Sequence, residues 1–123
     1  MALTKALADE NRIRILLALQ EGELCVCQLT ELIELAPSTT SKHLSILYQS
    51  GLLNMRKDGR WIYYQLAGKK AALPVREAIR WVIHSVSDEP RFAQDALRLK
   101  KILAVSPTEL CKRHLPGGPP LAF

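Results

Sequence analysis

Three cysteines are the residues of this chain best suited to metal or covalent chemistry. Cys25 and Cys27 are separated by one residue, and Cys111 lies far along the chain. Thiolate sulfur is a soft ligand for soft metals and trivalent metalloids, and two thiols can also be oxidised to a disulfide. An odd cysteine count favours metal or redox chemistry over a structural disulfide framework, although three inert buried thiols also fit it.

The first two cysteines lie where a helix is predicted to begin. On a regular helix, residues two apart point about 200° away from each other, so Cys25 and Cys27 converge only if the helix begins between them or is unwound there. The positive end of a helix is also expected to lower the pKa of a nearby thiol, which favours the thiolate that binds metal. We therefore expect ligand capture to strain the start of this helix.

Composition predicts a single domain in the cytoplasm. The 123 residues are 48% hydrophobic and 24% charged, which suffices for one core. The sequence shows neither a signal-peptide pattern nor an apolar run of about 20 residues that would span a membrane. The net charge of +5 suggests an acidic partner. Residues 35–66 carry four cations, Lys42, Arg56, Lys57 and Arg60, against the single acidic residue Asp58.

The first half of the chain predicts a pair of helices joined by a short turn. Asp9 is a suitable N-cap for a helix over residues 10–20, which follows a short helix over residues 3–8. Apolar residues at helical spacing after the cysteines predict a helix that ends before Pro37, and this proline opens the next helix, which Gly51 ends. The buried stripe of that last helix is expected to comprise Thr40, Leu44, Leu47 and Tyr48.

The second half predicts a β-hairpin and further helices. An alternating run from Leu53 and a β-rich run ending at Leu66 flank Asp58-Gly59, a type I′ turn signal, so a two-stranded wing is expected. A helix over residues 73–86 follows. Asp88 is the expected cap of the next helix. The apolar stripe of that helix is predicted to be Phe92, Ala96, Leu99 and Leu103.

The end of the chain is predicted to be an extension of the main domain. Ser106 opens a capping box before a short helical turn that carries Cys111. The proline- and glycine-rich stretch Pro116–Pro120 is expected to be disordered. We therefore divide the chain into a DNA-binding and dimerisation domain, residues 1–103, and a C-terminal extension, residues 104–123.

Two helices joined by a short turn and followed by a β-hairpin predict a winged helix-turn-helix, a mainly α fold that binds double-stranded DNA. The second helix enters the major groove, and the wing reaches the backbone or the minor groove. A solvated helix face is the plain alternative, and a structural hydrogen bond explains His43 equally well. The expected DNA-binding residues are Ser38, Thr39, Ser41, Lys42 and His43 on the helix, with Arg56, Lys57 and Arg60 in the wing.

The order and spacing of these motifs resemble the ArsR/SmtB family of bacterial metal-sensing repressors over about residues 3–86. The resemblance implies a homodimer that binds an operator in its own promoter and leaves it when metal or metalloid binds. It also implies a dimer interface formed by the first helix and the helix over residues 73–86. The matching stretches are Ala6–Ile15, Gly22–Leu29, Ser41–Leu44, Ser50–Leu53 and Asp58–Leu66.

The stretch Leu-Cys-Val-Cys, residues 24–27, resembles the arsenic- and antimony-responsive branch of this family. That resemblance implies that Cys25 and Cys27 bind trivalent arsenic or antimony as the inducer. The branch has a third cysteine three residues beyond the second, where this chain has Thr30. Trivalent arsenic is commonly three-coordinate, so the inorganic ion needs one more ligand, although two thiolates suffice for a methylated arsenical. Cys111 is the remaining thiol, and an exposed position in the tail is its plain alternative.

Other interpretations of the cysteines stay open. A redox switch would pair Cys111 with Cys27 or Cys25, because a direct disulfide across one residue would be strained. A nickel, cobalt or cadmium site could combine cysteines with His43 or His114.

Two further classes of site are disfavoured. The zinc site found elsewhere in the family needs several Asp, His and Glu ligands, and the helix over residues 73–86 offers only Glu77 and His84. A small thiol enzyme or metal chaperone is disfavoured because the chain has no Cys-x-x-Cys motif and no glycine-rich phosphate loop. We expect no organic cofactor.

Overall fold

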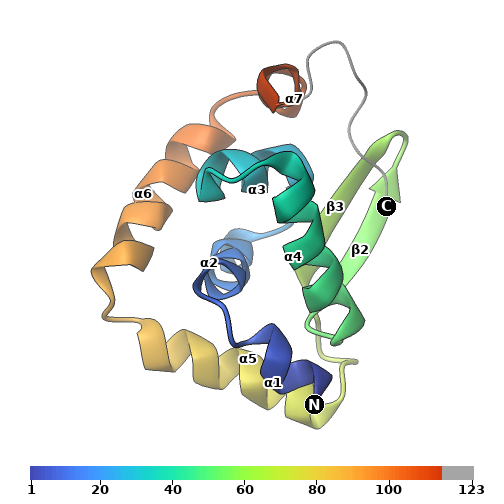
Figure 1. The fold of residues 1–123 in the computed structure, drawn as a ribbon, viewed down its shortest axis with the longest axis vertical. Helices are drawn as coiled ribbons and strands as arrows, with labels where there is room; N and C mark the ends of the chain where they lie inside the picture. Colours follow the sequence, from blue (N-terminus) through green and yellow to red (C-terminus); the bar gives the residue numbers. More distant parts are fainter. Residues whose placement is uncertain (115–123) are drawn as a thin grey trace.

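The structure is a computed structural model that describes residues 1–114, so the expected tail Pro116–Pro120 lies outside the described residues. Figure 1 shows α2 (Glu10–Ala18) in the middle of the view, with α3 (Val26–Ile33) and α7 (Pro107–His114) above it, α6 (Pro90–Leu103) along one side and the sheet along the other. No helix within residues 1–114 is long and apolar enough to cross a membrane. The elements are α1 (Ala2–Ala6), α2 (Glu10–Ala18), a 3-10 turn (Leu19–Glu21), β1 (Leu24–Cys25), α3 (Val26–Ile33), α4 (Pro37–Gln49), β2 (Leu53–Asp58), β3 (Trp61–Leu66), α5 (Leu73–Val86), α6 (Pro90–Leu103) and α7 (Pro107–His114).

Helices α3 and α4 form the helix-turn-helix, and α2 packs beneath both. The Asp9 side chain accepts hydrogen bonds from the first turn of α2, as expected of an N-cap. Glu34 follows α3 with a left-handed φ of 62° and turns the chain. Pro37 then opens α4, where its fixed φ suits a helix start and its missing N–H costs no hydrogen bond. The core between the three helices includes Ile15, Leu29, Leu32, Leu44 and Leu47.

The wing is a three-stranded antiparallel sheet in the order β1-β3-β2, not the expected two-stranded hairpin. Strand β1 has only two residues, too few for an alternating pattern to reveal. Asp58 pairs with Trp61, so the turn residues are Gly59 and Arg60. Of these two turn residues, only Gly59 has a positive φ, 62°. This pattern fits a type II′ turn and corrects the expected type I′, which needs a positive φ at both positions.

Helix α6 departs from its prediction at its start and along its buried face. Glu89, not Asp88, occupies the N-cap position, and its side chain makes no capping hydrogen bond. Ala96 and Leu103 of the predicted stripe are exposed. The buried face instead comprises Asp95, Leu99 and Ile102, because the Asp95 carboxylate forms an ion pair inside the protein. In α4, Tyr48 is likewise 43% exposed, whereas the rest of the predicted stripe is buried.

Helix α7 returns to α3 and packs against it. It begins where the capping pattern predicts, because the Glu109 N–H donates to Ser106 Oγ over 3.3 Å. Leu110 and Cys111 are buried in the same core as the helix-turn-helix. The segment after residue 103 therefore shares the core of the main domain.

Candidate thiol site and DNA-facing surface

The start of α3 lies between the two neighbouring cysteines. Cys25 ends β1 and is the N-cap of α3, and Cys27 lies in the first turn. The Cys25 backbone N–H donates to Gln28 Oε1 over 2.9 Å, so Gln28 reaches back over the helix start. Cys25 therefore belongs to both the sheet and the helix. The prediction that the helix begins between the two residues is confirmed.

The expected lowering of the thiol pKa is wrong for Cys25. Its side chain is 1% exposed, and this burial raises the pKa of the thiol because the charged thiolate loses its hydration. Backbone N–H groups at the helix start act in the opposite direction, but they are the smaller influence. Cys25 is therefore a buried, neutral thiol in this state.

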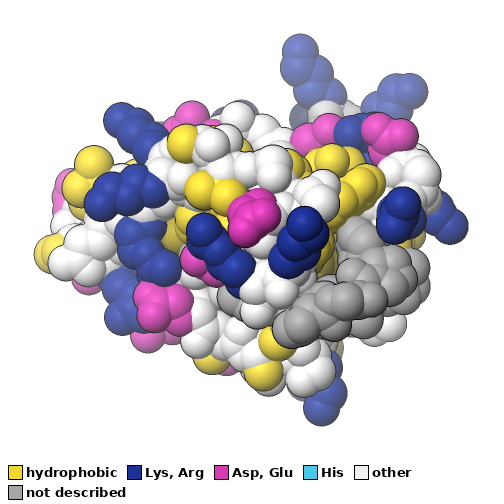
Figure 2. Space-filling view, turned by 90° about the horizontal axis from the view of Figure 1, so that it is seen from above, with side chains coloured by type: hydrophobic (Ala, Val, Ile, Leu, Met, Phe, Trp, Pro, Cys, Tyr) yellow, Lys and Arg dark blue, Asp and Glu magenta, His cyan; other side chains and the backbone are white. Residues whose placement is uncertain are grey.

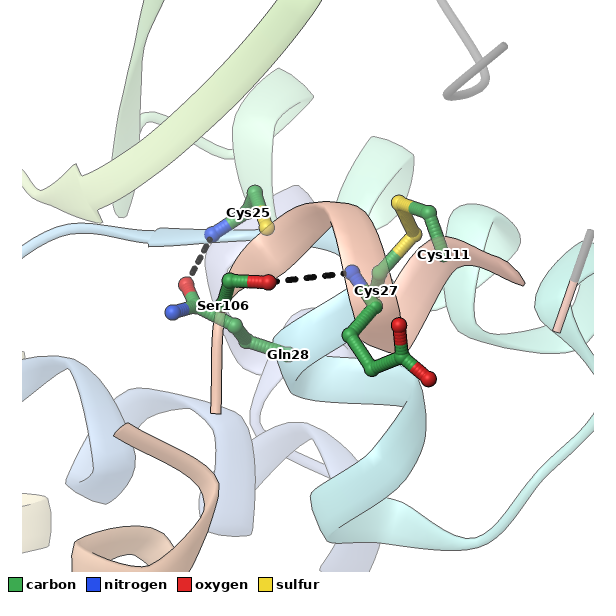
Figure 3. The surroundings of a disulfide bond; sticks show 6 residues. Cys25, Cys27, Gln28, Ser106 and Cys111 are labelled. Atoms are coloured by element: carbon green, nitrogen blue, oxygen red, sulfur yellow. Dashed lines mark hydrogen bonds between the residues drawn. A yellow bond between two sulfur atoms is a disulfide. The ribbon is translucent and has the colours of Figure 1, made fainter. Parts of the chain in front are cut away.

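Cys27 and Cys111 are brought together by α7 and form a disulfide (Figure 3). Their Cα atoms lie 5.2 Å apart although they are separated by 84 residues in sequence. Cys25 remains a free, buried cysteine outside this pair. The structure thus places the remote Cys111 beside Cys27, buried rather than exposed as the plain alternative would have it.

Over the part of the chain that the structure describes, the disulfide pair is not part of a preformed metal site. Among residues 1–114, no three His, Cys, Asp or Glu side chains lie so that they could hold a metal ion. Thr30, one turn after Cys27 on α3, is 1% exposed, and its buried hydroxyl has no hydrogen-bond partner. The three-cysteine ligand set therefore stays a prediction.

The other end of α3 is held by two guanidinium groups that the sequence did not single out. Arg14 is buried and forms a bidentate ion pair with Asp95 at 2.8 and 2.9 Å, and it also donates to the Leu32 carbonyl over 3.3 Å. Arg98 donates to the carbonyls of Leu32 and Glu31 over 3.0 Å each. These donors satisfy carbonyls at a helix end that have no partner within the helix. The only sequence signal was Asp95, an acidic residue that interrupts the apolar spacing of α6.

The residues predicted on α4 fall into two groups. Ser38, Thr39 and Lys42 are exposed at the N-terminal part of the helix. Ser41 is half-buried, and its hydroxyl is buried without a partner. His43 packs toward α2, with Nδ1 at 3.1 Å from Arg12 Nη1, and burial lowers its pKa. Ser38, Thr39 and Lys42 are therefore free to contact a partner. Ser41 and His43 instead face the rest of the protein.

All three wing cations, Arg56, Lys57 and Arg60, are exposed, and Arg56 also makes contacts inside the protein. Arg56 is engaged by Glu23 and lies over the ring of Tyr63 at 4.8 Å. Figure 2, seen from the end that carries α7, shows Lys and Arg side chains interspersed with acidic ones. The net positive charge is therefore spread over this face and not gathered in one patch.

Comparison with known proteins points to one family. The model described as "Bacterial regulatory protein, arsR family" matches residues 9–55. The chain is 49% identical over 63 residues to the arsenic resistance transcriptional regulator ArsR1 of Pseudomonas putida, covering 50% of this chain and 49% of that protein. It is 48% identical over 66 residues to the arsenical resistance operon repressor of Escherichia coli, covering 53% and 56%. The chain spans about half the length of these relatives.

A solved structure extends the likeness beyond the matched segment. The homodimeric winged helix-turn-helix DNA-binding domain Mb0332 of Mycobacterium bovis, described as a possible ArsR-family regulator, is similar with a TM-score of 0.58 and 30% identity. The similarity covers 72% of this chain and 77% of that domain. The predicted winged helix-turn-helix fold is confirmed.

Proposed function

Because the chain belongs to the arsR family of bacterial regulatory proteins, we propose that it is a transcriptional repressor that binds operator DNA as a homodimer. Trivalent arsenic or antimony is the proposed inducer, and its capture by cysteine sulfur releases the operator. The names of the P. putida and E. coli relatives support this ligand class. The main structural support for this proposal is the position of Cys111. It lies against Cys27 in the first turn of α3, the helix that precedes α4.

Helix α4 is the proposed recognition helix. Ser38, Thr39 and Lys42 are exposed near its N-terminus, where a recognition helix meets base edges and phosphates. Lys57 and Arg60 extend the cationic surface into the wing. A dimer of such units would bind a palindrome whose half-sites lie about 34 to 36 Å apart, or a multiple of that distance.

Helix α5 supports the proposed dimer. Ile79 and Val82 face the core, but Leu73 and Trp81 on the same helix are 56% and 67% exposed. Large exposed apolar side chains on one element are typical of a surface that another chain covers. A second copy of this chain is the proposed occupant.

The thiols fit a soft trivalent ligand once the disulfide is reduced. Trivalent arsenic prefers thiolate sulfur and commonly takes three donors. Cys27 and Cys111 are already adjacent, and Cys25 is the remaining cysteine and only two residues away. Within residues 1–114 no group of three such ligands is already in place, so the third sulfur has to be brought in by a rearrangement. We therefore assign Cys27 and Cys111 as the primary pair and Cys25 as the third donor.

The position of Cys25 explains how capture would reach the DNA. Cys25 pairs with Tyr63 in the sheet and caps α3, so its sulfur joins the pair only if this junction rearranges. A displaced start of α3 shifts the helix-turn-helix, because α3 and α4 share a packed core. The operator contacts of α4 would then be lost.

The decisive experiment measures operator binding by fluorescence anisotropy, under reducing conditions, with and without arsenite. Coupling of this kind typically changes affinity by about 5- to 150-fold. We expect the parent protein to be released, and Cys27→Ser, Cys111→Ser and Cys25→Ser to bind DNA but resist release. Gln94→Ala, an exposed change on α6 outside the thiol site, is the control and should respond like the parent. Normal release of Cys27→Ser would reject the assignment.

The disulfide favours a second candidate, a redox-controlled repressor. In such a switch the Cys27 and Cys111 thiols give up two protons and two electrons to hydrogen peroxide, which becomes two water molecules. Peroxide without arsenite would then change operator affinity in the parent and in Cys25→Ser, but not in Cys111→Ser. An affinity that ignores peroxide excludes this candidate.

A further inference from the structure

One cross-strand row connects a cysteine with the outer edge of the wing. Cys25 on β1 pairs with Tyr63 on β3, and Tyr63 pairs on its other side with Arg56 on β2. Directly opposite residues in an antiparallel sheet project from the same face, with Cβ atoms about 4.5 to 5.5 Å apart. The Cys25 thiol and the Arg56 guanidinium therefore flank one aromatic side chain.

Arg56 is committed to contacts within the protein. Its Nε donates to Glu23 Oε2 over 2.9 Å, and Nη2 donates to the other oxygen of the same carboxylate. Its guanidinium carbon lies 4.8 Å from the centre of the Tyr63 ring, and Asp58 lies 3.6 Å from Nη1. A bidentate pair fixes the orientation of the guanidinium, and stacking on the ring adds to this. Arg56 thus braces β2 against the residue that begins the cysteine segment, across the intervening strand.

We propose that the Glu23–Arg56 contact over Tyr63 is the link through which Cys25 sets the position of the wing. Arg56 is then a positioning residue and not a DNA contact, and the proposal rests on the function proposed above. Strand β1 consists of two paired residues, so moving Cys25 toward Cys27 removes both of its pairs with β3. Glu23, two residues earlier in the chain, moves with it and leaves Arg56.

Two roles of Arg56, bracing the wing and contacting DNA phosphate, predict opposite effects of Glu23→Gln on operator affinity. If Arg56 braces the wing, loss of the ion pair loosens the DNA-binding form, and operator affinity falls. If Arg56 instead reaches phosphate, the carboxylate competes with DNA, and its removal leaves the affinity equal or higher and steepens the salt dependence. The direction of a single change therefore separates the two roles.

The test compares Glu23→Gln, Arg56→Lys and their double variant with the parent, with and without arsenite, over a range of salt. Arg56→Lys keeps the charge but cannot form the fork. Each single variant should bind arsenite-free operator about two- to fivefold more weakly, in keeping with one exposed ion pair, with an unchanged salt slope. The ratio of affinities without and with arsenite should fall by the same factor. The double variant should be no worse than either single variant, because both remove the same contact.

The control is Glu21→Gln, which removes the same charge two residues earlier, whereas the carboxylates paired with Arg56 are those of Glu23 and Asp58. It should match the parent in affinity and in release. Tighter binding by Glu23→Gln, or parent-like binding by both single variants, would overturn the proposal. A parent protein that ignores arsenite would reject the proposed function alone, because the arsenite-free affinities still decide whether Arg56 braces the wing.

Discussion

The two ends of α3 are held by different chemistry. Its start depends on Cys25 and Cys27, on the Gln28 cap and on a disulfide to α7. A reductant would open the disulfide, and a thiol ligand would draw on the cysteines. Its end is held by the guanidinium groups of Arg14 and Arg98, which neither a thiol ligand nor a reductant would alter. Each end is tied to the same C-terminal arm, α6 and α7. The contrast indicates a helix that can be displaced at its start while its end stays in place.

The largest expected effect comes from breaking the fixed end. Asp95→Ala leaves the buried Arg14 guanidinium without its partner, and breaking one side of a buried ion pair costs about 3 to 5 kcal/mol. Urea unfolding measures this loss. The double variant Arg14→Met plus Asp95→Leu removes both charges and should lose less than Asp95→Ala. If Asp95→Ala loses less than about 1 kcal/mol, the end of α3 is not anchored in this way.

A smaller effect is expected at the start of α3, and only in the oxidised protein. The disulfide closes a loop between residues 84 apart, and such cross-links typically contribute about 2 to 4 kcal/mol. Oxidised parent protein should therefore unfold at higher urea concentration than Cys111→Ser, and the two should agree after reduction. Hydrogen exchange should show that reduction loosens residues 26–29 more than residues 30–33. Equal loosening of both ranges would show that reduction does not act preferentially on the start of α3.

The capping contacts give a closer comparison of the two ends. Gln28→Leu removes the acceptor for the Cys25 N–H, and Arg98→Leu removes two donors to the last carbonyls of α3. Each change should cost about 1 kcal/mol of unfolding free energy, in the range of helix caps and ordinary hydrogen bonds. Only Gln28→Leu should also change arsenite-driven release. If Arg98→Leu alters release equally, both ends take part in the response.

Local signals explain why much of the fold was predicted from sequence. Asp9, Pro37 and Gly51 mark helix ends through their own backbone and side-chain preferences, and the hairpin is marked by alternation around Gly59. Strand β1 was missed because two residues carry no periodicity, and its pairing is decided by β3. The type of turn depended on the register, which places Arg60 in the loop.

The candidate site was only partly accessible from sequence. The motif order identified the family, and the apolar pattern after the cysteines placed a helix start at Cys25 and Cys27. The partner of Cys111 could only be offered as alternatives, because it depends on how α6 carries the chain back over α3. The raised pKa of Cys25 was missed for a related reason. A position at a helix start is visible in the sequence, but the burial of Cys25 in the folded core is not.

The smallest expected effect is a pH dependence confined to the start of α3. Burial raises the pKa of the Cys25 thiol, so the folded protein favours the neutral form. The stability linked to this group is complete below the ordinary cysteine pKa and is lost as the pH rises through the raised value. The unfolding free energy of the parent should therefore fall more steeply between about pH 8 and pH 10 than that of Cys25→Ala. Urea unfolding of both proteins across this range measures the difference, and groups that titrate equally in both cancel. Arg14 at the other end of α3 keeps its charge throughout, because its hydrogen bond to Asp95 raises the pKa of the guanidinium further. Parallel profiles for the two proteins would show that Cys25 is less buried in solution, and the start of α3 would then be no more sensitive to alkali than its end.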